Sequence, residues 1–94
     1  MPLSTVQHRK VLFSGRVQGV GFRYTTQRLA SGFDVTGCVR NLSNGQVELL
    51  IEGAAAEIDR VIQSLRDDFG HDIQSIDTEN LPSSGDYAGF TIRR

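Results

Sequence analysis

Cysteine is almost missing from this sequence, which has 94 residues and a single cysteine, Cys38. One thiol cannot form a disulfide within the chain, and it cannot build a cysteine-ligated zinc site. Long apolar runs are missing as well. The opening segment MPLSTVQHRKVLF contains no stretch suited to a secretory signal, and no segment approaches the roughly 20 apolar residues of a membrane span. These absences predict a reduced, cytoplasmic protein without a lipid anchor.

An excess of charge of either sign is also lacking, because ten basic residues face eleven acidic ones and leave a formal charge of −1. Such a chain has no overall field that would attract nucleic acid or a membrane surface, so any anion must be bound by a local arrangement. The hydrophobic content of 38% is typical of a soluble globular protein. We expect residues 1–94 to form one monomeric domain, with 1–7 as a flexible N-terminal tail.

The hydrophobic pattern predicts alternating strands and helices. Read from the N-terminus, the expected elements are a strand ending near Gly15, a helix in 22–33 that stops at Gly32, a strand in 34–42, a strand in 46–53, a helix in 54–69 closed by Gly70, and a final strand in 87–94. Residues 72–79 alternate weakly and are expected as an added edge strand. Asn44 and Gly45 predict a two-residue hairpin turn, because both residues tolerate positive φ.

The order β-α-β-β-α-β predicts an α+β ferredoxin-like sandwich, with two helices on one face of an antiparallel sheet. Each β-α-β crossover should be right-handed and should leave a gap for another strand. The first two strands then run parallel, so their C-terminal ends, near Gly15 and Asn41, lie at the same edge of the sheet. The first helix also begins at that edge.

Three glycines crowd the segment SGRVQGVGFRY, residues 14–24, where the first strand gives way to the first helix. Glycine allows successive N–H groups to turn toward one point, and a helix N-terminus adds unpaired N–H groups and partial positive charge. The loop is therefore built like a phosphate cradle. Its spacing, G-x-x-x-G-x-G, matches neither the dinucleotide fingerprint nor the P-loop, which argues against a nucleotide triphosphatase.

Arg23 stands in the first helical turn, where a cation opposes the helix dipole at a cost of about 0.3–1 kcal/mol. A guanidinium beside an amide nest can chelate two oxygens of a phosphoryl group, and this would compensate the cost. The alternative is a tight glycine turn followed by a solvated surface arginine. For Asn41, at the end of the second strand, the alternatives are a turn cap and an amide that orients a water molecule.

The segments GRVQGVGFR and VRNLSNGQVEL, together with the closing GFTIRR, resemble the acylphosphatase family over residues 8–94. The resemblance implies hydrolysis of the carboxyl–phosphate bond of small acyl phosphates, without a metal or organic cofactor. Inorganic phosphate is the implied product and an expected inhibitor. By motif match, Arg23 and the loop of residues 16–22 bind the phosphoryl group, and Asn41 positions the attacking water. The implied phosphate-binding N–H groups belong to Val17, Gln18, Gly19, Val20, Gly21 and Phe22.

No serine, cysteine or aspartate is placed as a nucleophile in this loop, and no histidine lies near either motif. Because an acyl phosphate already has a good leaving group, positioning and charge stabilisation should suffice. We therefore expect direct attack by water without a phosphoenzyme, with an oxygen of the substrate's own phosphate taking the water proton.

Other residues with reactive side chains are expected to be structural. Cys38 stands where the family often has an aromatic residue and should be partly buried, or a redox sensor if it is exposed. His8 and His71 are expected at the surface, and the pair 67–68 should be solvated. Arg16 is expected to steer anions toward the loop.

Three rival functions share the predicted fold. A non-catalytic anion-binding or regulatory module would use the same loop, and domains similar to acylphosphatase occur inside larger enzymes that act on carbamoyl phosphate. An RNA-binding sandwich would need aromatic residues on the middle strands, which here carry one aromatic and two glutamates. A metallochaperone would need paired cysteines in the first loop. The last two readings therefore find no support in the sequence.

Overall fold

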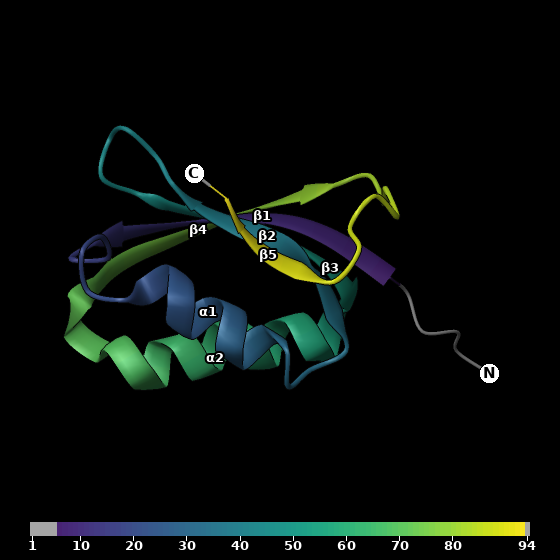
Figure 1. Cartoon of the computed structure of the whole chain (residues 1–94), viewed down its shortest axis with the longest axis horizontal. Coiled ribbons are helices and arrows are strands. Elements are labelled where there is room, and N and C mark those ends of the chain that lie inside the picture. The colour runs from purple at the N-terminus through teal and green to yellow at the C-terminus, as the bar shows by residue number, and fades with distance from the viewer. Residues whose placement is uncertain (1–5, 94) are drawn as a thin grey trace.

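A computed structural model describes residues 6–93, in which two helices cover one face of a five-stranded sheet (Figure 1). The elements are β1 (Val6–Gly15), α1 (Phe22–Ala30), β2 (Val35–Asn41), β3 (Val47–Ala54), α2 (Ala55–Phe69), a short 3₁₀ turn η1 (Gly70–Asp72), β4 (Ile73–Leu81) and β5 (Phe90–Arg93). Within the described chain, no helix is long and apolar enough to cross a membrane. Of the predicted tail, 1–5 lie outside the described residues, whereas Val6 and Gln7 belong to β1.

The strands follow the order β4-β1-β3-β2-β5, which confirms the ferredoxin-like arrangement. β3 lies between β1 and β2 and is antiparallel to both, so β1 and β2 run parallel as expected. The sheet is mixed rather than wholly antiparallel, because β5 pairs in parallel with β2. The segment 73–81 lies at an edge as predicted, but it is the fourth strand, and thus the last element, of the β-α-β-β-α-β pattern. The added strand is the C-terminal β5.

The core lies between the helices and the sheet and follows the predicted periodicities. Alternate residues of β3 (Val47, Leu49 and Ile51) and one face of α2 (Ile58, Val61 and Leu65) are fully buried. Phe22, the first residue of α1, packs its ring against Phe13 and Phe69, with ring centroids 5.0 and 4.6 Å apart. These aromatic contacts fix the start of α1 on the sheet, directly beside the glycine loop.

The other face of the sheet carries polar residues that the 82–89 segment covers. His8 is buried there, which corrects the prediction of a surface residue, whereas His71 is exposed as expected. The Nδ1 atom of His8 lies 2.8 Å from the Pro82 carbonyl oxygen, and its Nε2 lies 2.7 Å from the Tyr87 hydroxyl. Nδ1 donates to the Pro82 carbonyl oxygen, which can only accept, and Nε2 shares a hydrogen bond with the Tyr87 hydroxyl. Burial raises the pKa of Tyr87, so its hydroxyl stays protonated.

Glu52 holds the same segment by its carboxylate. It accepts the backbone N–H groups of Ser84, at 2.7 Å, and of Gly85, at 3.0 Å, and the Ser84 hydroxyl lies 3.3 Å away. Burial alone would raise the pKa of Glu52, but the two N–H donors, the hydroxyl of Ser84 and the nearby His8 hold it below its ordinary value. The 82–89 segment therefore closes around an anion that the chain itself supplies.

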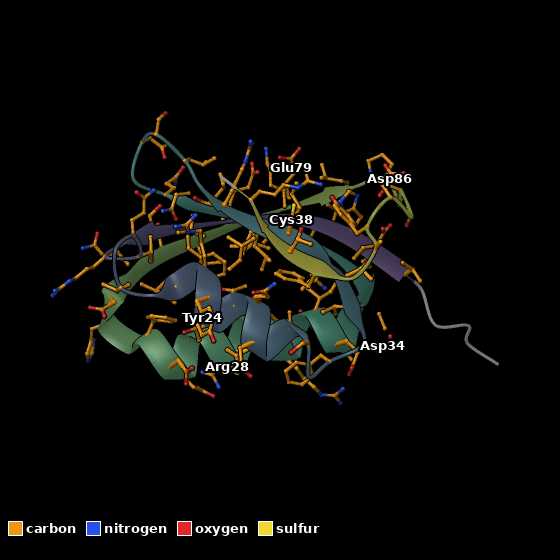
Figure 2. All side chains as sticks on the ribbon, viewed as in Figure 1. Tyr24, Arg28, Asp34, Cys38, Glu79 and Asp86 are labelled. Atoms are coloured by element: carbon orange, nitrogen blue, oxygen red, sulfur yellow. The ribbon has the colours of Figure 1, made fainter. Side chains whose placement is uncertain are left out.

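Cys38 lies on the sheet in Figure 2 and is 2% exposed, so it is more deeply buried than predicted. Burial raises the pKa of its thiol, which favours the unreactive protonated form. The redox-sensing alternative required an exposed thiol and is not supported. Asp67 and Asp68 are exposed, as expected for a solvated pair.

Candidate active site

The glycine loop begins at a close backbone contact. The backbone N–H of Arg16 donates to the Asp72 carbonyl oxygen at 2.7 Å, and Gly15 has a φ of 119°. A Cβ atom at position 15 would lie 2.4 Å from that same oxygen, so no larger residue fits. Glycine is thus required here for the approach of β1 to η1, and the contact fixes where the loop leaves the sheet.

Gly19 and Gly21 serve a different purpose from Gly15, because no atom lies within 4 Å of a Cβ built on either residue. Both have left-handed backbone angles, with φ of 76° and 80°, and Gly21 is the N-cap of α1. No side chain of residues 6–93 caps this helix, and its first turn has no acidic residue. Its first N–H groups therefore point into open space, where an anion would satisfy them.

A small hollow of ≈ 180 Å³ lies at this helix start. Its walls are formed by Val17, Gly19, Gly21, Phe22, Arg23, Tyr24, Asn41 and Ile92. Arg23 and Asn41, which the sequence placed in separate motifs, thus line one concave surface together with four of the six predicted phosphate-binding residues. The remaining two behave differently: Val20 packs against the hydrophobic core, and the side chain of Gln18 turns toward the β2–β3 connection.

Arg23 remains in conflict with the helix dipole, as the sequence analysis anticipated. Within residues 6–93 it has no carboxylate partner, and its one hydrogen bond runs from Nη1 to the Arg93 carbonyl oxygen at 3.5 Å. The guanidinium is half-buried. An anion in the hollow would therefore meet an uncompensated positive charge and the free N–H groups of α1 together.

Asn41 reaches the hollow because of strand periodicity. Val39 is fully buried under the helices, and residues two apart on a strand point to the same face. Asn41 is the last residue of β2, so its side chain extends past the core toward the start of α1. Its amide can both donate and accept a hydrogen bond at that position.

The connection between β2 and β3 corrects one prediction. Leu42 donates its N–H to the Gln46 carbonyl oxygen at 2.8 Å, and Gly45 donates to the Leu42 carbonyl at 3.2 Å. These bonds define a three-residue loop, 43–45, rather than a two-residue turn. Within this loop only Gly45 has a positive φ, at 92°, because no non-glycine residue of the described chain has one. One glycine in the left-handed region is the usual geometry of a three-residue hairpin, and it leaves Asn44 in an ordinary conformation.

Gln18 contributes through its side chain, a role the sequence analysis missed. Its Nε2 donates to the carbonyl oxygens of Leu42 and Gln46, both at 2.8 Å. The Gln46 side chain in turn donates from Nε2 to the Ser14 hydroxyl at 2.8 Å. The glycine loop is thus tied to the hairpin that directly follows Asn41. Since both acceptors are backbone carbonyls, only the fold, and no motif of residue types, could have revealed the contact.

Comparison with known proteins identifies the family of the chain. The family model "Acylphosphatase" matches residues 9–92. The chain belongs to the acylphosphatase family. Among curated relatives, the acylphosphatase of Rubrobacter xylanophilus is 39% identical over 85 residues, covering 89% of this chain and 77% of that protein. The acylphosphatase of Salinibacter ruber is 35% identical over 95 residues, covering 100% of both chains.

Solved structures give the same result. The crystal structure of acylphosphatase from Bacillus subtilis superposes with a TM-score of 0.84 at 30% identity, covering 96% of this chain and 100% of that one. Full-length HypF in its phosphate- and nucleotide-bound form superposes with a TM-score of 0.87 at 26% identity, covering 99% of this chain but only 12% of that protein. Family membership makes the chain a hydrolase of the acylphosphatase class.

Proposed function

We propose that this protein hydrolyses the carboxyl–phosphate bond of small acyl phosphates by direct attack of a water molecule oriented by Asn41. The phosphoryl group is held by the N–H groups of residues 17–22 and by the Arg23 guanidinium, whereas the N–H of Arg16 already donates to the Asp72 carbonyl oxygen. The observation that supports this most strongly is the shared hollow, because one concave surface combines a helix N-terminus, a strand-end amide and a guanidinium that has no carboxylate partner among residues 6–93.

Binding of the phosphoryl group uses charge and donors that the fold leaves unpaired. Gly19 and Gly21 keep the loop open on the side of the hollow, and α1 presents its unpaired N–H groups there. Donors held in place before the substrate arrives need no reorganisation when charge develops on the phosphoryl oxygens. Arg23 can engage two of those oxygens at once.

The chemical step needs a water molecule placed in line with the leaving carboxylate. Asn41 lines the same hollow as the glycine loop, so its amide is suited to hold that water. None of the side chains that line the hollow is a serine, cysteine, aspartate or histidine, which fits water attack without a covalent phosphoenzyme. The water proton passes to a phosphoryl oxygen, and the products are a carboxylate and inorganic phosphate.

The test is steady-state hydrolysis of acetyl phosphate by the purified protein and by two variants, Arg23→Ala and Asn41→Ala. Each variant should lose about 10²–10³ in kcat, the loss seen when one oriented donor is removed from a developing anion. Thermal melting should show that both variants remain folded. Arg66→Ala and Asn80→Ala, which remove exposed residues of the same types elsewhere, serve as matched controls. Near-normal turnover in either site variant would reject the assignment.

A further inference from the structure

Two exposed apolar side chains lie at the hollow that holds Arg23 and Asn41. The large hydrophobic residues exposed in the described chain are Val6, Tyr24 and Ile92, with 53%, 69% and 37% of their surface accessible. Both Tyr24 and Ile92 line the hollow, whereas Val6 lies elsewhere, at the start of β1. A phosphoryl group gains nothing from apolar contact, so these two residues must serve another part of the molecule that binds there.

The added strand β5 places Ile92 at this position. In the parallel pairing of β2 and β5, Ile92 lies opposite the buried Val39 and therefore faces the helices. Phe90, opposite Gly37, shares that face. Gln27 of α1 donates from Nε2 to the Phe90 carbonyl oxygen at 3.2 Å, which holds the helix and the strand side by side.

A second, wider hollow of ≈ 490 Å³ follows α1 beyond Tyr24. Tyr24 and Arg28, one helical turn apart, line it from the helix, and Phe33 and Phe90 add aromatic walls. Figure 2 labels the side chains of Tyr24 and Arg28 on α1. Tyr24 lines both hollows. Tyr24 thus borders both the phosphate-sized hollow and a wider one, whose walls combine aromatic and aliphatic side chains with the polar Gln27, Arg28 and Ser31.

We infer that Tyr24 and Ile92 form the acyl-group subsite of the enzyme and favour acyl phosphates with an aromatic or bulky apolar acyl group. The inference rests on the proposed function. A hollow of ≈ 180 Å³ is smaller than the roughly 300 Å³ needed to enclose a whole drug-sized ligand, so it holds little beyond the phosphoryl group. With that group seated on the glycine loop, the acyl group must leave the hollow along its rim. The rim residues Tyr24 and Ile92 offer it apolar contact.

The test compares benzoyl phosphate with acetyl phosphate, two substrates that share the reacting bond and differ in apolar bulk. The quantity measured is the ratio of kcat/KM for benzoyl phosphate to that for acetyl phosphate, which cancels any general loss of catalytic power. The ratio should fall about tenfold in Tyr24→Ala and in Ile92→Ala, the size of effect expected for an apolar contact at a specificity pocket. Tyr24→Leu, which keeps an apolar side chain, should retain most of the wild-type ratio.

Val6→Ala is the matched control, because it truncates an exposed aliphatic residue away from the hollow and should leave the ratio unchanged. Thermal melting of each variant confirms that the fold is intact. A ratio that stays at the wild-type value in both Tyr24→Ala and Ile92→Ala overturns the subsite while acyl-phosphate hydrolysis stands. A wild-type protein that hydrolyses neither substrate overturns the proposed function, and the subsite with it.

Discussion

Two segments of this chain, 16–21 and 82–89, both offer backbone N–H groups to a negative charge, but the charge has a different origin in each. In the 82–89 segment the N–H groups of Ser84 and Gly85 are occupied by the Glu52 carboxylate. In the 16–21 segment only the N–H of Arg16 is occupied, by the Asp72 carbonyl oxygen, while the first turn of α1 has no acidic residue and Arg23 adds a cation there. The arrangement at 82–89 is complete within the protein and holds a loop in place. The 16–21 arrangement would be completed by an anion, as the proposed binding site requires.

The largest expected effect comes from placing a carboxylate of the protein itself beside the 16–21 segment. Asn41→Asp places a carboxylate at the hollow without changing the size of the side chain. We expect kcat/KM for acetyl phosphate to fall about 10³-fold, because the new charge competes for the donors and repels the phosphoryl group.

Stability should move the other way in Asn41→Asp, with the free energy of unfolding rising by about 0.3–1 kcal/mol from the charge near the α1 N-terminus. Hydrolysis rates and urea denaturation measure the two effects, and Asn80→Asp on β4 is the control for adding a charge. A variant that loses stability along with activity would mean that the hollow is a structural contact rather than an anion site.

A smaller effect is expected from Gln18, whose side chain links the glycine loop to the hairpin after Asn41. Gln18→Ala should reduce kcat by about 10²-fold while KM changes little. Without this link Asn41 and the water that it holds would shift relative to the glycine loop, and a shift of about an ångström slows mainly the chemical step. Steady-state kinetics separate the two constants. Gln63→Ala, which removes an exposed amide bonded to Asp67, should leave both unchanged. An increase in KM alone would show that Gln18 serves substrate binding instead.

The smallest effect concerns the 82–89 segment and its contact with Glu52. Glu52→Gln should lower the free energy of unfolding at pH 7 by about 1.5 kcal/mol, since the amide cannot accept both N–H groups as a carboxylate does. Activity should be unaffected, because Glu52 lies on the face of the sheet away from the hollow.

The effect of Glu52 should also depend on pH in a defined direction. Its pKa is lowered in the folded protein, so its contribution is complete above the unfolded value of about 4.3 and is lost as the pH falls through the lower folded value. Urea denaturation at pH 7 and at pH 3 should therefore show the gap between wild type and variant narrowing in acid. A gap of constant size would mean that the charge of Glu52 does not act.

The sequence was informative wherever one residue type leads to one local geometry. The apolar repeat of α2, the alternation of β3 and the stop at Gly70 all appear in the structure as expected. The pairing of Arg23 with Asn41 at one hollow also followed, because parallel strands bring their C-terminal ends to the same edge.

The errors arose where tertiary contacts override local preference. His8 is polar and was expected in water, but Tyr87 and Pro82 arrive from the far end of the chain and bury it. Asn44 could have adopted positive φ, yet the hydrogen bonds of the hairpin assign that conformation to Gly45 alone. The place of β5 depended on which of two short, weakly alternating segments would pair with β1, and the register of a sheet cannot be read from either segment alone.

The contact between Arg16 and Asp72 also orders events while the chain folds. These two residues are far apart in the sequence, and β4, which directly follows η1, pairs with β1 beside this contact. Contacts between such distant segments close late, because the entropy of a long loop must first be overcome. A chain still lacking β4 already carries every glycine of the loop, and Arg23 and Asn41 as well, but it lacks the support that gives them a common shape. We therefore expect the site to be among the last parts of the molecule to form.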